Sequence, residues 1–202
     1  MSDGAALALA ALLLALNAFF VGAEFALISA RRSQIEPKAQ AGSRAARTTL
    51  HAMENVSVMM AGAQLGITIC SLGLGAVGEP ALAHLIEPLF ERVGVAEAFV
   101  HPVAFVLALV VVVAAHVVLG EMVPKNIAIA GPERSALVLA PALVAVVAVL
   151  RPVIVGLNAI ANATLRLIRV EPKDEVSSTY TREEVAALVE ESRGEGLLEE
   201  EE

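Results

Sequence analysis

The residues best suited to chemistry form the run Gly-Glu-Met-Val-Pro-Lys at 120–125, which follows a strongly apolar stretch. Pro124 has no N–H to donate to the carbonyl oxygen four residues earlier, which belongs to Gly120. We therefore expect an interrupted helix that leaves this oxygen free beside the Glu121 carboxylate. Hard cations prefer such oxygen ligands, so the run favours a cation site. The alternative is a Glu121 that caps a helix end and pairs with Lys125.

Two further apolar stretches carry polar side chains at helical spacing. Asn17 and Glu24 lie seven residues apart with Val21 between them, and the second stretch repeats this spacing at Gln64, Thr68 and Ser71. Polar stripes within lipid usually face the interior of a helix bundle. They could be hydrogen-bonded contacts between helices, worth about 0.6 kcal/mol a pair, or could share a polar site with Glu121.

Other residues with reactive groups suggest no enzyme. His116 lies one turn before Gly120, but no Cys or His stands near it, so we expect a hydrogen-bonded structural histidine rather than a transition-metal ligand. Cys70 sits in an apolar run and is expected to be a small buried residue. No Ser/His/Asp, Cys/His or paired-carboxylate arrangement is present in the sequence. We therefore expect no catalytic activity.

Glycines are concentrated in the second apolar stretch. Residues 73–78 match the G-x-G-x-x-G nucleotide-binding pattern, but no predicted strand precedes them, so nucleotide binding is not expected here. Gly62 and Gly66 have the small-xxx-small spacing that lets helices approach closely. Gly22, in the first stretch, is expected to interrupt its helix, as is Pro124.

The composition is that of a membrane protein. Hydrophobic residues make up 57% of the chain, aromatic residues only 3%, and the mean hydropathy is +0.72. Acidic residues crowd into 171–202, so the net charge of −8 describes the C-terminal tail more than the apolar part. An acidic chain of this kind argues against nucleic acid as a partner.

These patterns predict an all-α membrane protein with about three transmembrane helices plus re-entrant or juxtamembrane helices. The expected apolar segments are 5–28, 56–77, 102–119 and 136–165, with an amphipathic connector at 79–101. The basic stretch 31–54 reads either as a helical piece at the inner membrane face or as a solvated connector. Segment 136–165 carries Arg151 and Pro152 at its centre, so we expect it to turn back or to lie partly along the interface.

Lysine and arginine counts give the orientation. The first loop carries more of these residues than any other loop, which places it in the cytoplasm, the N-terminus outside and the C-terminus inside. Residues 1–170 form the predicted transmembrane domain, and 171–202 a cytoplasmic linker with a capping-box signature at Thr181 and Glu184. The chain ends within an acidic turn, so we expect it to be truncated before a further domain.

The runs NAFFVGAEFAL at 17–27 and LGEMVPK at 119–125 resemble the transmembrane domain of the CNNM/CorC magnesium transporter family, some of whose members carry a hemolysin label. Residues 180–202 resemble the helical link to that family's cytoplasmic CBS pair, so the resemblance covers essentially the whole chain. It implies a homodimer in the plasma (inner) membrane of a bacterium. Nucleotide would bind only through domains beyond this chain.

The resemblance also implies a function and a site. The family moves or senses Mg²⁺, often coupled to Na⁺, and Glu121 with the Gly120 carbonyl matches its acidic ion-binding element. Gln64 and Thr68 fall where the family has its second-helix polar pair, and its first-helix Ser falls on Val21, which has no ligand oxygen. Asn17 and Glu24, one turn to either side, are candidate substitutes. We expect a Mg²⁺ transporter; the alternative is a non-transporting membrane scaffold or sensor.

Overall fold

The computed structural model describes residues 2–94, 96–168 and 170, and all regular structure in these ranges is helical. The predicted linker at 171–202, with its capping box, lies outside the described residues. In chain order the elements are α1 (Asp3–Ser29), α2 (Arg32–Gln40), α3 (Arg44–Glu54), α4 (Val56–Val93), α5 (Glu97–Ala115), the π-helical segment η1 (His116–Met122), α6 (Val123–Ala130) and α7 (Pro132–Leu167).

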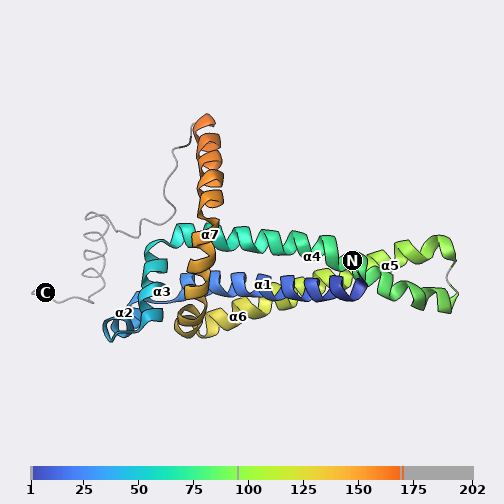
Figure 1. The fold of residues 1–202 in the computed structure, drawn as a ribbon, viewed down its shortest axis with the longest axis horizontal. Helices are drawn as coiled ribbons and strands as arrows, with labels where there is room; N and C mark the ends of the chain where they lie inside the picture. Colours follow the sequence, from blue (N-terminus) through green and yellow to red (C-terminus); the bar gives the residue numbers. More distant parts are fainter. Residues whose placement is uncertain (1, 95, 169, 171–202) are drawn as a thin grey trace, which may run out of the picture.

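The helices α1 and α4 pack side by side over most of their length, and the α5–η1–α6 run returns alongside them (Figure 1). Glycines of α4 make the close approach possible. A Cβ atom at Gly66 would lie 2.5 Å from the Phe20 ring of α1, and one at Gly62 would overlap Val147 of α7. The predicted small-xxx-small contact at these two glycines is therefore confirmed. A core of buried apolar residues from α1, α4 and α7 forms around them.

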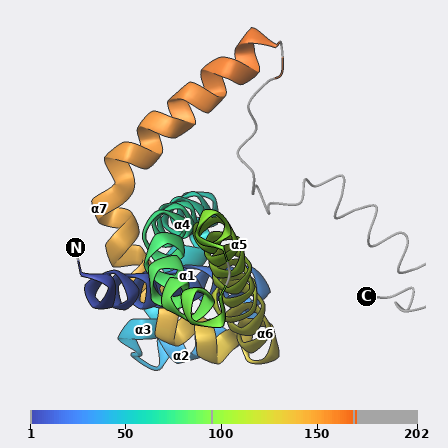
Figure 2. The same cartoon turned by 90° about the vertical axis from the view of Figure 1, so that its right-hand side faces the viewer.

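Within the residues that the structure describes, four helical runs are long and apolar enough to cross a membrane: Asp3–Ser29, Val56–Val93, Glu97–Ala130 and Pro132–Leu167. They do not share one direction. The helices α1, α4 and the α5–η1–α6 run follow the long axis of the molecule, whereas α7 runs across it (Figures 1 and 2). The expectation that segment 136–165 turns back is wrong, because α7 is continuous through Pro141 and Pro152. The other expectation, that this segment lies partly along the membrane interface, stays a prediction.

The second apolar segment is longer than predicted. Residues 79–93 continue α4 as a helix through Pro80 and Pro88, so the predicted connector at 79–101 is wrong. Each proline removes a single hydrogen bond, and the many remaining bonds keep the helix continuous. The chain turns at Gly94, whose φ of +82° is a conformation that glycine adopts without strain, and α5 begins at Glu97.

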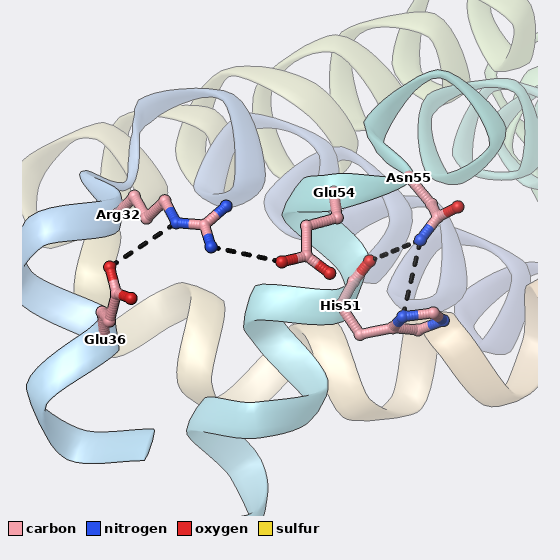
Figure 3. A network of polar contacts seen from close by, with 5 residues as sticks. All are labelled: Arg32, Glu36, His51, Glu54 and Asn55. Atoms are coloured by element: carbon pink, nitrogen blue, oxygen red, sulfur yellow. Dashed lines mark hydrogen bonds and ion pairs between the residues drawn. The ribbon is translucent and has the colours of Figure 1, made fainter. Parts of the chain in front are cut away.

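The basic stretch 31–54 forms α2 and α3, as the helical reading predicted. Arg32 of α2 lies 3.6 Å from Glu36 and 3.2 Å from Glu54 of α3 (Figure 3). These pairs are half-exposed, so each adds little stability. On the other side of α3, the Thr49 side chain is fully buried. Its hydroxyl donates to the Ala45 carbonyl of its own helix at 2.9 Å and lies 3.3 Å from the Ala136 carbonyl of α7. This face of α3 packs against the start of α7.

Candidate functional site: a buried polar cluster beside the π-helical segment

The backbone widens directly before Pro124. Residues His116–Met122 form one wide turn of π-helix, and the Val123 N–H donates to the Val118 carbonyl, five residues earlier. The helix therefore continues through the predicted interruption at Pro124 by changing its pitch. Short π-helical segments often mark functional sites, because they displace backbone groups from the regular hydrogen-bond pattern.

A side chain from another helix donates a hydrogen bond to a backbone carbonyl of this segment. Asn17 of α1 is fully buried, and its Nδ2 donates to the Gly120 carbonyl oxygen at 3.0 Å. A Cβ atom at position 120 would lie 3.1 Å from this nitrogen and 3.1 Å from Leu14 Cδ1. Glycine at 120 thus lets the amide approach the backbone closely. The structure brings together Asn17, Gly120 and, next in sequence, Glu121.

Two further residues complete the cluster. Ser71 of α4 has its hydroxyl 3.2 Å from Asn17 Oδ1 and 2.9 Å from His116 Nε2. His116 Nε2 in turn lies 3.7 Å from Glu121 Oε1. The expectation that His116 is hydrogen-bonded is therefore confirmed. The sequence placed Ser71 on a polar stripe but did not identify it, or His116, as members of the site.

The remaining predicted ligands lie elsewhere. The Thr68 hydroxyl donates to the Gln64 carbonyl of its own helix at 2.8 Å, and both residues are exposed. The half-buried Glu24 carboxyl group lies within reach of the Gln64 side chain. Val21, between Asn17 and Glu24 on α1, is only 5% exposed. The polar side chains thus form two groups, one around Asn17 and one at Glu24 and Gln64.

Gly22 has a different role from the one expected. The helix α1 continues through it, so the predicted interruption there is wrong. A Cβ atom at this position would lie 3.3 Å from Leu139 Cδ1 of α7 and 3.8 Å from Pro124 Cβ of α6. The glycine allows α6 and α7 to pack tightly against α1, which sets the position of the Gly120 backbone relative to Asn17.

The cluster offers few charged ligands. Within the described residues there is no group of three or more His, Cys, Asp or Glu side chains that could hold a metal ion. The Glu121 side chain is 45% exposed, and its carboxylate lies 3.7 Å from His116 Nε2. The Lys125 ammonium group lies 4.6 Å from the centre of the Phe25 ring instead of pairing with Glu121. Glu121 is therefore the single carboxylate of the cluster.

The glycines at 73–78 do not form a phosphate-binding loop, because they lie inside the helix α4.

Long apolar helices around a buried polar cluster define a polytopic membrane domain. The chain belongs to the CNNM family, described as the cyclin M transmembrane N-terminal domain, whose profile matches residues 8–202.

Several bacterial proteins are similar along nearly the whole chain. An uncharacterized protein of Mycobacterium tuberculosis (strain H37Rv) is 50% identical over 197 residues, which cover 98% of this chain and 56% of the relative. The UPF0053 protein YhdT of Bacillus subtilis is 35% identical over 198 residues, 98% of this chain and 43% of that protein. The UPF0053 protein YugS of Bacillus subtilis is 34% identical over 186 residues, 92% and 43% of the two chains. This chain thus spans about half the length of these relatives.

The hydrogen bonds of Asn17 predict a measurable loss of stability in Asn17→Ala. The change leaves the Gly120 carbonyl without its donor and Ser71 without its acceptor, so the free energy of unfolding should fall by about 1–3 kcal/mol. Unfolding in mixed detergent micelles measures this change. The matched control is Asn158→Ala on the exposed part of α7, which should change stability by about 0.5 kcal/mol or less. Equal losses in the two variants would contradict the assigned contacts.

Proposed function

We propose that this chain is the membrane domain of a divalent-cation transporter with Mg²⁺ as its cargo and Na⁺ as the candidate coupling ion. The observation that carries the proposal is the Gly120 carbonyl, which lies on a π-helical segment, cannot accept from Pro124, accepts from Asn17, and is next in sequence to the only carboxylate of the cluster. Transporters commonly bind their ions where irregular helix exposes backbone carbonyls within the membrane. Membership of the CNNM family supports this assignment.

The proposed ligands are the Glu121 carboxylate, the Gly120 carbonyl oxygen and the amide oxygen of Asn17. Mg²⁺ takes six oxygen ligands at about 2.0–2.1 Å and gives up its water reluctantly, so bound water would supply the remaining positions. A site with one carboxylate binds weakly enough to release its ion. Thr68 is left out of this set because its hydroxyl donates to a carbonyl of its own helix. We propose that Glu24 and Gln64 form a second polar contact for the ion as it crosses the membrane domain.

The proposal includes an orientation and an assembly. The basic α2–α3 pair would face the cytoplasm of a bacterium and the N-terminus the outside, by the distribution of lysine and arginine. We propose a homodimer in the plasma membrane with no enzymatic activity. Regulatory domains beyond this chain, such as the CBS pair, would bind any nucleotide.

A non-transporting scaffold or sensor is the second candidate. It is favoured by Val21, which is buried at the position where the family resemblance places a serine. The two candidates differ in ion flux. Liposomes that contain this chain and a Mg²⁺-sensitive dye should report uptake well above that of protein-free liposomes. A folded protein that gives only the protein-free rate would favour the scaffold.

The valine at position 21, where the family resemblance places a serine, gives a further prediction. Val21→Ser should raise the affinity for Mg²⁺ about two- to tenfold, a change of about 0.4–1.4 kcal/mol. The added hydroxyl oxygen would lie one turn from Asn17 on the same face of α1. Titration of the purified protein with Mg²⁺ measures the affinity. Val21→Ala is the control, since it also removes side-chain volume but adds no oxygen; an equal gain in both variants would show that the hydroxyl is not a ligand.

A further inference from the structure

The hydrogen bonds of the cluster have one direction. Each buried side-chain nitrogen or oxygen of the described residues has a hydrogen-bond partner. The buried Asn17 Oδ1 is an acceptor only, so the Ser71 hydroxyl must donate its single proton to it. Ser71 therefore has no proton for His116, and His116 Nε2 must carry the hydrogen and donate to the Ser71 oxygen. The chain of donors runs from His116 through Ser71 and Asn17 to the Gly120 carbonyl.

This direction conflicts with cation binding at Gly120. The Asn17 Nδ2 hydrogen points at the Gly120 oxygen, and a cation there would meet the positive end of the amide dipole. A half-turn of the Asn17 amide would exchange its nitrogen and oxygen and remove the conflict. Oδ1 would then face the ion and Nδ2 would donate to the Ser71 oxygen. Ser71 would in turn donate to His116 Nε2, which must then be unprotonated.

Both directions satisfy the donors and acceptors within the chain of side chains. In the reversed state the hydrogen leaves Nε2 and another is taken up from water at Nδ1, so the imidazole stays neutral. His116 is partly exposed, with 19% of its side chain accessible. The Ser71 hydroxyl can accept a hydrogen bond from Asn17 or His116 while it donates to the other, so it fits both directions. An alanine at this position could do neither.

Resting on the proposed function, we infer that Asn17 is a reversible ligand whose amide blocks the Gly120 carbonyl without an ion and turns to present Oδ1 when Mg²⁺ binds. Ser71 and His116 are positioning residues. They hold the amide in either of its two orientations and report which orientation is present through the tautomer of His116.

The test is the tautomer of His116 measured by ¹⁵N NMR of the protein labelled at histidine, with and without saturating Mg²⁺. The resonances of His116 are assigned by comparison with His116→Gln, since the chain has four histidines. We expect an Nε2–H tautomer without Mg²⁺ and a shift to the Nδ1–H tautomer with it. Glu121→Gln at the same Mg²⁺ concentration should keep the Nε2–H form, because it lacks the charged ligand. Ser71→Ala should uncouple the ring, so that bound Mg²⁺ no longer changes its tautomer.

The outcomes separate this inference from the proposed function. If calorimetry shows that the wild type binds Mg²⁺ but the tautomer stays Nε2–H, the amide does not turn and only this inference is overturned. If the Ser71→Ala ring still changes tautomer with Mg²⁺, the relay through Ser71 is wrong. If the wild type does not bind Mg²⁺ at all, the proposed function and this inference fail together.

Discussion

Glu121→Gln is expected to abolish Mg²⁺ flux into liposomes while leaving the protein folded. Two unit charges about 4 Å apart attract by roughly 4 kcal/mol at an effective dielectric constant of about 20. Glu121 is the single carboxylate of the cluster, so its neutralisation removes the main electrostatic attraction for the cation. With Mg²⁺ below its dissociation constant, the flux should fall about 100-fold or more, to the rate of protein-free liposomes.

The control for this variant is Glu97→Gln. Glu97 is the first residue of α5, whereas Glu121 lies in η1. Glu97 is exposed and outside the cluster, so its flux should equal that of the wild type. Thermal unfolding of both variants in detergent tests whether they fold. Wild-type flux in a folded Glu121→Gln protein would mean that the carboxylate takes no part in transport.

Gly66→Ala is expected to cause the second large effect, a loss of about 1–3 kcal/mol in the free energy of unfolding, as overpacking typically does. The added Cβ would lie 2.5–2.6 Å from ring atoms of Phe20, in the contact between α1 and α4. Helix propensity acts in the opposite direction, since alanine is preferred over glycine by about 1 kcal/mol. The steric term should dominate because Phe20 is itself only 7% exposed and has little room to move.

Two further variants isolate the steric cause. Gly75→Ala on the same helix has only Glu79 Oε1 nearby, at 3.7 Å, and should keep or raise the stability. Adding Phe20→Leu to Gly66→Ala should recover part of the loss, because the smaller side chain leaves space for the new methyl group. Unfolding in detergent measures all three proteins. Losses of the same size at positions 66 and 75 would refute a specific α1–α4 contact at Gly66.

The position and length of the apolar runs predicted most of the fold. The first segment was expected at 5–28 and is α1, Asp3–Ser29, because a long apolar run in lipid must form a continuous helix. The end of α4 could not be predicted from residue types alone. Pro80 and Pro88 are typical of helix ends, but a helix tolerates the loss of single hydrogen bonds when the flanking turns are intact.

The candidate site was predicted in part. The absent N–H of Pro124 pointed to a free carbonyl at Gly120 without any knowledge of the fold. Asn17 was a candidate for the same site, but its contact with the Gly120 carbonyl could not be predicted, because the two residues are 103 positions apart and local spacing carries no information about such contacts. The roles of Ser71 and His116 also depend on how α4 packs against α1 and η1. Thr68 shares the polar stripe of Ser71, yet its hydroxyl bonds to its own helix.

The most direct test of the account is calorimetric titration of the purified protein in detergent with Mg²⁺, wild type beside Glu121→Gln. The account predicts saturable binding by the wild type and an affinity lower by about 100-fold or more in the variant, equivalent to about 2.7 kcal/mol. That result would place the ion at Glu121. Undiminished binding by Glu121→Gln, or no binding by the wild type at millimolar Mg²⁺, would contradict the proposed site and favour the scaffold.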